Sequence, residues 1–313
     1  MRDHGGRISD AIAEYGGSFG DWLDLSTGIN PTPYPIGKLS DDLWTRLPDP
    51  AAENRLIEAA RSFWNIPDDC AVLAAGGASA LIAALPGLRP PDRVQIARET
   101  YNEHEAAFAA AGWQINRDNA PARVIVRPNN PDGLIDPLPA PLPDLLVIDE
   151  SFADVTPDQS LVAHATKLGV IILKSFGKFW GLAGLRLGFA IGHPAEISKL
   201  RDRIGPWPVS GPALEIATRA LGDHDWAVET RAQLSNAAKR LDQIVEPIST
   251  APVQGTDLFR LITCKNALDV HQHLSRHHIL TRIFPYNRNW LRLGLPGTEV
   301  DWSRLESALS HLK

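Results

Sequence analysis

The stretch 175–188 constrains this chain more than any other, because a lysine and an arginine stand among glycines directly after an apolar run. Val170-Ile-Ile-Leu leads, one residue later, into Ser-Phe-Gly-Lys-Phe-Trp-Gly-Leu-Ala-Gly-Leu-Arg-Leu-Gly, which begins at Ser175. A short apolar run is typical of a buried strand, and the glycines that follow it favour tight turns. The pattern alone fits a strand, a glycine-rich turn that carries Lys178, and a second strand.

Lys178 has neighbours that suit one particular chemistry. A lysine forms an imine with an aldehyde cofactor, and the hydroxyl of Ser175 and the guanidinium of Arg186 suit the phosphate of such a cofactor. A surface lysine in an ordinary turn would account for the glycines as well. It gives no reason for the pairing of Ser175 with Arg186, so we interpret Lys178 as an imine lysine.

In its S-x-x-K and GLAG-x-R-x-G parts, this segment resembles the Schiff-base segment of fold-type I pyridoxal-phosphate (PLP) enzymes, the class I/II aminotransferase group. The resemblance implies an α/β protein with the PLP-dependent transferase fold type I. Its large domain would contain a mainly parallel sheet, and its smaller C-terminal domain would be α+β. The resemblance also implies pyridoxal 5'-phosphate as cofactor and a homodimer with the active site at the interface.

The bulk composition fits a globular chain that is long enough for a large and a small domain. The 313 residues are 44% hydrophobic and 22% charged. A net charge of −6 argues against a nucleic-acid partner, and the apolar runs are too short for a membrane span. The N-terminus lacks the apolar segment of a signal peptide. Cys70 and Cys264 read as reduced thiols, so we expect a cytoplasmic protein.

Short apolar runs predict buried parallel strands at 94–97, 124–126, 145–148 and 170–173. Amphipathic patterns predict helices at 53–64, 80–88 and 223–245, and further strands at 258–262 and 289–294. Ligands of open α/β sheets bind at the carboxyl ends of the strands. We expect an N-terminal arm over residues 1–35, a PLP-binding domain over 36–208 and a small domain over 209–313.

Asp149 follows the strand predicted at 145–148 and resembles the acid of the family's hydrophobic-D-E-A-Y pattern. The resemblance implies that this carboxylate bonds the pyridine nitrogen and keeps it protonated, which makes the ring an electron sink. A helix cap or strand-end turn is the plain alternative. Phe152 stands where the family has a tyrosine that bonds the ring hydroxyl, so one phenol donor is absent.

Asn130 lies in Arg-Pro-Asn-Asn-Pro-Asp-Gly, which resembles the family's N-P-N-N-P-T-G loop. In that loop the last asparagine contacts the ring hydroxyl of the cofactor. Asparagine, proline and glycine also make ordinary turns. The position of Asn130 ahead of Asp149, in the order that the family shows, favours the cofactor contact.

A helix N-terminus is predicted at Gly77, Ala78 and Ser79, where backbone N–H groups form an anion site. The family places the cofactor phosphate at such a turn, and a plain helix N-cap is compatible with that role. Tyr101 follows the strand predicted at 94–97, where the family commonly stacks an aromatic ring on the pyridine. An ordinary rim aromatic is the alternative. His104 either backs the site or is structural.

Arg292, in Trp-Leu-Arg-Leu-Gly-Leu-Pro-Gly, matches the family's C-terminal arginine that grips the substrate carboxylate. A guanidinium makes two parallel bonds to a carboxylate and so fixes the orientation of the substrate. The alternative is a solvated strand arginine. The resemblance implies catalytic roles for three residues at the cofactor: Lys178, which would carry a proton, Asp149 and Tyr101.

Two N-terminal motifs bear on the reaction: His4-Gly-Gly, and Leu-Asp-Leu-Ser-Thr-Gly-Ile-Asn30-Pro. They resemble the opening of the threonine-phosphate decarboxylase branch, which lies close to histidinol-phosphate aminotransferase and tends to have Phe at the position of Phe152. The resemblance implies decarboxylation of L-threonine O-3-phosphate, a small phosphorylated amino acid, in cobalamin synthesis. Arg292 would take the carboxylate, and His4 and Asn30, with Arg282, the phosphate. A frayed terminus and a simple turn are the plain alternatives.

Other functions remain open at this point. A histidinol-phosphate-type aminotransferase would use the same machinery, and a PLP-fold module that only senses a ligand would keep the fold without turnover. Leu47 stands where aminotransferases of this group often have a tyrosine that reaches the neighbouring subunit's phosphate. His273 and His277 are spaced like zinc ligands on a helix, but no Cys or carboxylate is close in sequence. We expect a solvated helix face there and no metal site.

Overall fold

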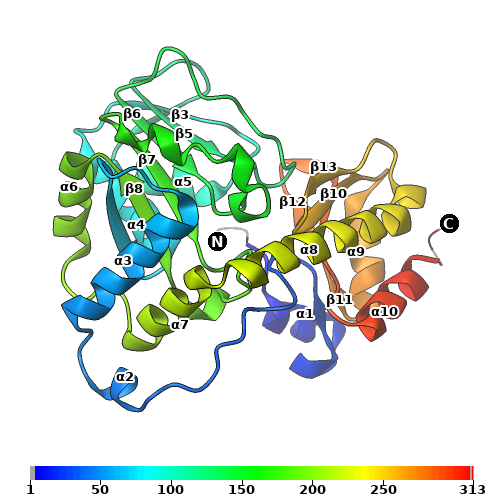
Figure 1. The fold of residues 1–313 in the computed structure, drawn as a ribbon. Coiled ribbons are helices and arrows are strands. Elements are labelled where there is room, and N and C mark those ends of the chain that lie inside the picture. Colours follow the sequence, from blue (N-terminus) through cyan, green and yellow to red (C-terminus); the bar gives the residue numbers. More distant parts are fainter. Residues whose placement is uncertain (1–3, 311, 313) are drawn as a thin grey trace. The chain divides into compact units, whose positions relative to one another are not determined.

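The computed structural model of the chain describes residues 4–310 and 312. These residues form two compact units (Figure 1). The large unit comprises residues 33–130 and 134–228. The terminal unit combines the N-terminal stretch up to Thr32, residues 131–133 and the stretch from Glu229 onward. The large unit contains one sheet and the terminal unit two.

A seven-stranded sheet forms the centre of the large unit, in the order β2-β8-β7-β6-β5-β3-β4. β8 runs antiparallel to both β2 and β7, and the other neighbours are parallel, which confirms the predicted mainly parallel sheet. The strands are β2 (Ala71–Ala75), β3 (Arg93–Ile96), β4 (Gln114–Asn116), β5 (Ala122–Val126), β6 (Leu145–Asp149), β7 (Val170–Ser175) and β8 (Gly188–Gly192).

The apolar runs predicted as strands correspond to β3, β5, β6 and β7. β2 has no counterpart among the predictions, because its sequence Ala-Val-Leu-Ala-Ala holds three alanines, which have little preference for strands. Its place in the sheet depends on pairing with β8 over the full length of both strands. Distant segments of the chain therefore determine this strand.

Helices surround the sheet of the large unit. They are α2 (Asp42–Thr45), α3 (Pro50–Trp64), α4 (Ala78–Ala84), α5 (Asn102–Ala110), α6 (Pro194–Ile204), α7 (Gly211–Gly222) and the first turn of α8 (His224–Val245). α3 begins where Asp49 caps the helix, since its carboxylate accepts a hydrogen bond from Ala51 N–H at 2.7 Å. It ends at Asn65, which has a left-handed φ of 50°.

The helix predicted at 80–88 is divided in the structure. α4 ends at Ala84, and residues Leu85–Leu88 continue as the 3₁₀ turn η2. Pro86 has no N–H to donate, so a regular α-helix does not continue through it. The other 3₁₀ turns are η1 (Phe19–Asp21), η3 (Ala153–Val155), η4 (Pro157–Gln159), η5 (Val162–Thr166), η6 (Ala183–Leu185) and η7 (Glu246–Ile248).

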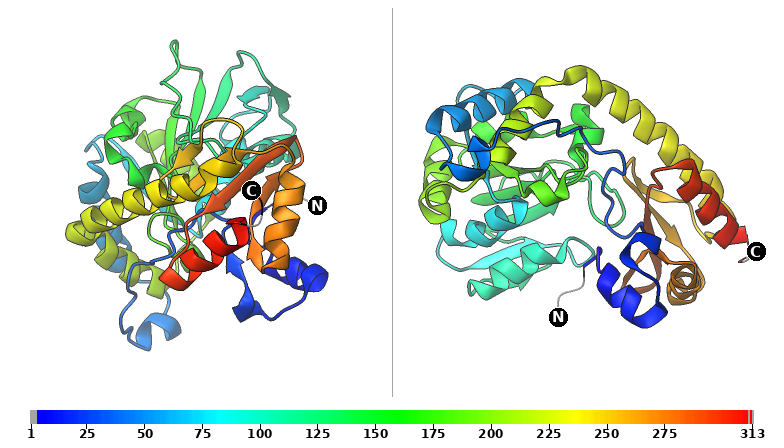
Figure 2. Two further views of the ribbon diagram at one scale, coloured as in Figure 1. Left: turned by 90° about the vertical axis from the view of Figure 1, so that its right-hand side faces the viewer. Right: turned by 90° about the horizontal axis from the view of Figure 1, so that it is seen from below.

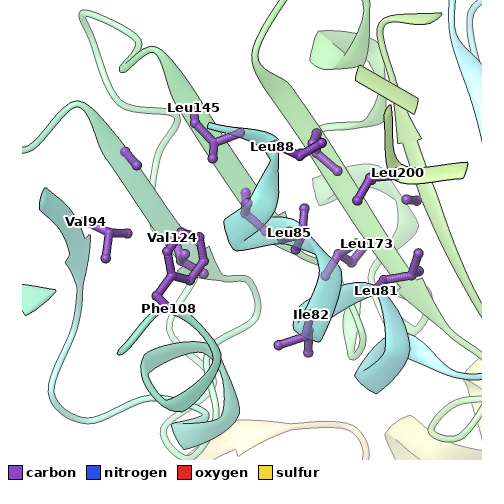
Figure 3. Packing of buried hydrophobic residues seen from close by; sticks show 14 of the residues in the cluster. Leu81, Ile82, Leu85, Leu88, Val94, Phe108, Val124, Leu145, Leu173 and Leu200 are labelled. Atoms are coloured by element: carbon purple, nitrogen blue, oxygen red, sulfur yellow. The ribbon is translucent and has the colours of Figure 1, made fainter. Parts of the chain in front are cut away.

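One large hydrophobic cluster joins α4, η2, α5 and α6 to the sheet. Figure 3 shows Leu81 and Leu85 directed toward the strands that carry Leu145 and Leu173. Because these side chains are fully or almost fully buried, they hold the N-terminus of α4 against the sheet. This packing positions the turn at Gly77.

The terminal unit contains a four-stranded antiparallel sheet in the order β12-β13-β10-β9, and a short parallel pair of β1 with β11. α9 packs against β13, with α1 and α10 as neighbours (Figure 2). The elements are α1 (Ile8–Tyr15), β1 (Leu23–Asp24), β9 (Gln254–Thr256), β10 (Phe259–Thr263), α9 (Ala267–Arg276), β11 (Ile279–Leu280), β12 (Arg282–Phe284), β13 (Asn287–Gly294) and α10 (Glu299–Ser310).

The division in space differs from the division that we predicted along the chain. The N-terminal stretch is part of the terminal unit and not a separate arm, because β1 pairs with β11 and Leu25 N–H donates to Leu280 O at 2.8 Å. The change of unit after residue 208 is displaced to the bond between Val228 and Glu229, inside α8. α7 belongs to the large unit, where it packs against α3. Among the described residues, we find no helix with the length and apolarity to cross a membrane.

Candidate active site

All nine residues predicted to contact the cofactor line one cavity in the large unit. They are Gly77, Ala78, Ser79, Tyr101, Asn130, Asp149, Ser175, Lys178 and Arg186. Asp149 and Ser175 are the last residues of β6 and β7, so the cavity lies at the carboxyl ends of these parallel strands. Ligands of open α/β sheets bind at this position.

Gly77 and Arg186 make close contact at this cavity. Gly77 has a φ of 90°, and a Cβ there would lie 2.7 Å from Nη2 of Arg186, so a larger residue would displace the guanidinium. Arg186 also has a positive φ, 55°, which is costly for a residue other than glycine. The guanidinium and the N–H groups at the start of α4 together favour an anion.

Gly188 brings β8 close to the same helix end. A Cβ at this position would lie 2.3 Å from the backbone nitrogen of Ala78. The glycine at the end of the motif therefore allows a close approach of strand and helix. This is a structural reason for the last glycine of the GLAG-x-R-x-G segment.

Lys178 lies in the turn after β7, half-buried, with its Nζ 5.2 Å from the ring centroid of Phe152. Phe152 is buried and lines the cavity at the position of the missing tyrosine. A phenylalanine ring offers its π face to a cation but no hydrogen-bond donor. The amine of Lys178 therefore meets an aromatic face where a phenol was expected from the family pattern.

Asp149 is buried, and both of its carboxylate oxygens accept hydrogen bonds. Oδ1 accepts from the Ser151 backbone N–H at 3.0 Å and from the Ser151 hydroxyl at 2.5 Å. Oδ2 lies 2.8 Å from Nε2 of His104. Burial raises the pKa of Asp149, but the bonds from His104 and Ser151 outweigh burial and hold the pKa below its ordinary value. Asp149 is therefore an anion at the edge of the cavity.

His104 is the residue that the sequence left undecided between a supporting and a structural role. It lies in the first turn of α5, fully buried, and contacts Asp149 from behind without lining the cavity. Tyr101, which does line the cavity, meets the His104 ring edge-on at 6.0 Å between ring centroids. The structure thus assigns His104 to the support of Asp149.

Two loops that carry predicted residues are tied together by Asn129. Its Oδ1 accepts from the Thr100 hydroxyl at 2.6 Å, and its Nδ2 donates to Glu99 O at 2.9 Å. These bonds join the loop of Asn130 to the loop of Tyr101. Sequence reasoning did not single out Asn129, although it stands next to Asn130 in the same motif.

A second polar cluster near the site was also missed from the sequence. Lys174, fully buried in β7, lies 2.7 Å from Glu150 Oε2 and 3.5 Å from Asp154 Oδ1. The indole N–H groups of Trp64 and Trp180 donate to Asp154 at 2.9 and 3.2 Å. A lysine directly after four apolar strand residues was the available signal, because a charge inside a buried strand requires a partner.

The predicted substrate residues His4, Asn30 and Arg292 belong to the terminal unit. His4 and Arg282 line a second cavity there, which is lined neither by Asn30 nor by Arg292. Asn30 is buried, and its Oδ1 accepts from Thr32 N–H at 2.9 Å. The structure therefore brings His4 and Arg282 together and places the Asn30 oxygen in a local turn.

Arg292 is buried in β13 and is not the solvated strand arginine of the alternative. Its Nη2 donates to Ser26 O at 2.6 Å, and its guanidinium carbon lies 5.0 Å from the ring centroid of Phe259. Arg282 is its partner across the β12–β13 pair. Burial, with a further contribution from Arg282, lowers the pKa of Arg292 to about 9. Two neighbouring guanidinium groups of this kind favour an anionic ligand.

The two N-terminal motifs contact each other. Gly6 N–H donates to the Ser26 hydroxyl at 2.7 Å, and a Cβ at Gly5 would lie 2.4 Å from Ser26 O. The His4-Gly-Gly stretch is therefore packed against the second motif and is not a frayed terminus. A residue larger than glycine at position 5 would separate them.

The histidine-rich stretch around α9 is only in part the solvated helix face that we expected, because His277 is exposed but His271 and His273 make hydrogen bonds. His271 Nδ1 lies 2.9 Å from the Thr281 hydroxyl, and His273 Nε2 lies 2.9 Å from Ala308 O. Both side chains are partly buried. Within residues 4–310 and 312, no group of three or more His, Cys, Asp or Glu side chains is arranged to hold a metal ion.

Comparison with known proteins places the chain in a family. The model of the family "Aminotransferase class I and II" matches residues 124–311. The chain belongs to this family. It is 37% identical to the threonine-phosphate decarboxylase of Pseudomonas aeruginosa, with 100% of this chain and 98% of the relative covered. It is also 37% identical to a threonine-phosphate decarboxylase from a Sinorhizobium species, with 99% and 98% covered.

A solved structure supports the fold-type I architecture. The histidinol-phosphate aminotransferase of Sinorhizobium meliloti, in complex with pyridoxal-5'-phosphate, has a TM-score of 0.80 at 20% identity, with 98% of this chain and 95% of that chain covered. At this identity the likeness concerns the fold. The predicted fold and the predicted cofactor of the family, pyridoxal phosphate, are confirmed.

Proposed function

We propose that this protein is a PLP-dependent decarboxylase that converts L-threonine O-3-phosphate to (R)-1-amino-2-propanol O-phosphate, a step of cobalamin synthesis. The observation that carries the proposal is the 37% identity, over essentially the whole chain, to two relatives named threonine-phosphate decarboxylase. The contact between the two N-terminal motifs supports it, because these motifs pointed to the decarboxylase branch.

The residues of the large-unit cavity fit pyridoxal phosphate. We assign the phosphate to the backbone at Gly77 and Ala78, the hydroxyls of Ser79 and Ser175, and Arg186, because these groups offer N–H and O–H donors and a cation. Asp149 would hold the pyridine nitrogen, since a buried carboxylate with a lowered pKa stabilises a cationic N–H. Tyr101 and Asn130 would contact the ring and its hydroxyl.

When bound, the cofactor supplies an electron sink for the carbanion that remains after carbon dioxide leaves. Lys178 is the proposed point of attachment for the cofactor. Its amine, once substrate has released it, holds the proton that replaces the departing carboxylate. Phe152 presents an apolar face to this amine and offers no phenol at that position. Asp149 retains its charge throughout.

The proposed substrate carries a carboxylate and a phosphate, and the terminal unit offers cations for both. We assign Arg292 to the carboxylate, because the pKa of this buried arginine is already lowered and a bound anion would stabilise its charge. His4 and Arg282, which line one cavity, would take the phosphate together with Asn30. Oriented binding of both groups would decide which bond to the α-carbon breaks.

The deciding experiment measures two products from one incubation. The protein with PLP and L-threonine O-3-phosphate is expected to release carbon dioxide and (R)-1-amino-2-propanol O-phosphate in equal amounts. Addition of 2-oxoglutarate should produce no glutamate. Glutamate formation without carbon dioxide would assign the chain to aminotransferases, and a bound cofactor with neither product would assign it to a sensing module.

We further propose a homodimer in the cytoplasm. Two large apolar side chains, Trp44 and Leu47, are 68% and 69% exposed on the large unit and suit burial against a second copy. Cys70 and Cys264 are buried free thiols, as expected in a reducing compartment. Light scattering after gel filtration tests the dimer, and Trp44→Glu with Leu47→Glu should shift the mass to that of a monomer.

A further inference from the structure

The cavity of the terminal unit has a further histidine in its wall. His271 lines this cavity together with His4, Arg282 and Glu14. These side chains come from the N-terminal stretch, α1, α9 and β12. His271 is partly buried, and its Nδ1 lies 2.9 Å from the hydroxyl of the buried Thr281. A contact between α9 and the residue that precedes β12 therefore holds the ring at the wall of the cavity.

The hydrogen-bond partner of His271 is compatible with both charge states of the ring. A hydroxyl can donate to the lone pair of a neutral ring nitrogen, and it can accept from the N–H of an imidazolium. His273, on the same helix, lies instead against the carbonyl oxygen of Ala308, which can only accept. The contact with Thr281 thus allows His271 to gain a proton without loss of its hydrogen bond.

Two charged side chains act on His271 from neighbouring elements. Burial lowers the pKa of His271 below its ordinary value; the carboxylate of Glu14 opposes this shift, and the guanidinium of Arg282 adds to it. Without a bound anion, the ring is therefore mostly neutral at neutral pH. A phosphate dianion beside Arg282 would add negative charge close to the ring and favour its charged form.

The other ionisable groups around His271 are paired or titrate far from neutral pH. Arg7 and Asp10, which also line the cavity, form an ion pair with each other. Burial raises the pKa of Tyr15, the phenol at the cavity. Arg304 of α10 and Arg292 of β13 donate to backbone carbonyl oxygens. On α9 itself, no ionisable residue stands three or four positions from the histidine.

We propose that His271 is a further ligand of the substrate phosphate: it takes up a proton when the phosphate binds beside Arg282 and His4, and it then donates a hydrogen bond to a phosphate oxygen. The proton comes from solvent, and no bond of the substrate changes. The inference rests on the proposed function, which assigns the phosphate to this cavity. It adds a determinant of specificity, because an unphosphorylated amino acid brings no charge that would favour the imidazolium.

A phosphate monoester without an amino group tests the proposal on the PLP-loaded protein. Isopropyl phosphate carries its phosphate on a secondary carbon, as the proposed substrate does, but it has no amine that reacts with the cofactor. Calorimetry in two buffers with different enthalpies of ionisation measures the protons taken up for each ligand bound. At about pH 7.5, well above the second pKa of about 6 of a phosphate ester, the parent should take up protons on binding.

His271→Asn keeps an amide near the position of Nδ1 for Thr281 but cannot gain a charge. Proton uptake should fall sharply in this variant, and the affinity at about pH 6.5 should fall by about 10-fold, the value of a hydrogen bond to a charged group. His273→Asn is the matched control on the same helix, because His273 is not among the described residues that line the cavity. It should keep the proton uptake and the affinity of the parent.

The pH dependence of the affinity gives a readout that a packing role does not move. Bound phosphate raises the pKa of His271, so the contribution of this residue is fully present below the pKa of the free protein and is lost as pH rises through the pKa of the complex. The difference between the parent and His271→Asn should therefore shrink between about pH 6.5 and about pH 9. His4→Gln in the His271→Asn background should remove the proton uptake that remains.

Equal proton uptake and a parallel pH dependence in the parent and His271→Asn would overturn the inference. Arg282→Met separates this outcome from a failure of the proposed function. If Arg282→Met and His4→Gln bind isopropyl phosphate as the parent does, or if the parent does not bind it, the phosphate assignment fails and the inference fails with it. If both variants bind weakly while His271→Asn binds normally, only the inference about His271 fails. Urea unfolding of each variant reports a general loss of stability separately.

Discussion

Asp149 and Glu150 are adjacent in sequence and both are buried, yet they belong to two different kinds of acidic cluster. Asp149 lines the cavity and accepts hydrogen bonds from a histidine and a serine. Glu150 does not line the cavity and forms an ion pair with the buried Lys174. Successive residues at a strand end point to opposite faces of the sheet. One carboxylate is therefore presented to a ligand, while the other is used within the protein.

The two carboxylates differ in the source of the cation that would face each of them. Burial lowers the pKa of Lys174, but Glu150 and Asp154 outweigh burial and raise the pKa above its ordinary value, so this lysine stays charged beside its two acids. At Asp149 the cation would be the protonated ring of the cofactor. We expect changes around Asp149 to affect cofactor binding, and changes around Glu150 and Lys174 to affect the free energy of unfolding.

The largest expected effect is on the cavity side of this comparison. Lys178→Ala removes the proposed attachment point and proton carrier, so decarboxylation should fall by roughly four orders of magnitude, the upper range for a general acid–base group. The absorbance band of the covalently bound cofactor should disappear, while the unfolding free energy without cofactor stays close to that of the parent. Lys199→Ala, at an exposed lysine, is the control. Normal turnover in Lys178→Ala would contradict the assignment.

Lys174→Met should lower the free energy of unfolding and leave cofactor binding nearly unchanged. The substitution leaves Glu150 and Asp154 buried without their lysine, which should cost about 3–5 kcal/mol of unfolding free energy. Urea unfolding of the cofactor-free protein measures this loss, and Lys199→Met controls for the change of residue type. Cofactor affinity of the folded fraction should remain near that of the parent. A large loss of cofactor affinity without a loss of stability would show that the cluster of Lys174 serves the cofactor and not the stability of the fold.

Acid should act on the cluster of Asp149. The pKa of this carboxyl is lower in the folded protein than in the unfolded chain, so its contribution to stability is present above the unfolded pKa and is lost as pH falls through the folded pKa. Below about pH 4, the unfolding free energy of the cofactor-free parent should therefore decrease more steeply than that of Asp149→Asn. Urea unfolding between about pH 6 and pH 3 compares the two slopes. Parallel curves would show that Asp149 does not contribute.

The smallest expected effects come from a matched pair of serines. The Ser151 hydroxyl donates to Asp149 at 2.5 Å, and the Ser160 hydroxyl donates to Glu150 at 2.6 Å. Each serine-to-alanine change should lower the unfolding free energy by about 1–3 kcal/mol, because each hydroxyl bonds a buried carboxylate. Ser151→Ala alone should also weaken PLP binding, measured by equilibrium dialysis. If both variants bind PLP equally, the two clusters do not differ in the way proposed.

Much of the proposed cofactor site was predictable because its residues are close to distinctive local patterns. Gly77, Asn130, Asp149 and Lys178 each stand beside an apolar run or a turn motif, and the carboxyl ends of parallel strands bring such positions together. The mainly parallel sheet followed from the same runs. The types of these residues and their order along the chain were enough to predict that they lie together, because parallel strands end at the same edge of the sheet.

Other features were not predictable from local patterns. The structure assigns His104 to Asp149 through a contact between α5 and β6, and sequence alone left this histidine undecided. No role was predicted for Lys174, because its ion pairs with Glu150 and Asp154 join residues of separate segments. The N-terminal stretch was expected as an arm, whereas β1 pairs with β11 from the far end of the chain. Such pairings join segments that are distant in sequence, and the local composition of one segment does not indicate its partner.

The amino-acid sequence by itself determined the family of the chain, its cofactor chemistry and nine of the residues that line the cavity, because these depend on residue types at particular spacings. The tertiary structure decided which carboxylate faces the cavity, which one forms an ion pair inside the protein, and which histidine supports the first. The physical reason is that burial and hydrogen-bond partners set the charge state of a side chain. Those partners come from elements that are distant in sequence and meet only in the folded chain.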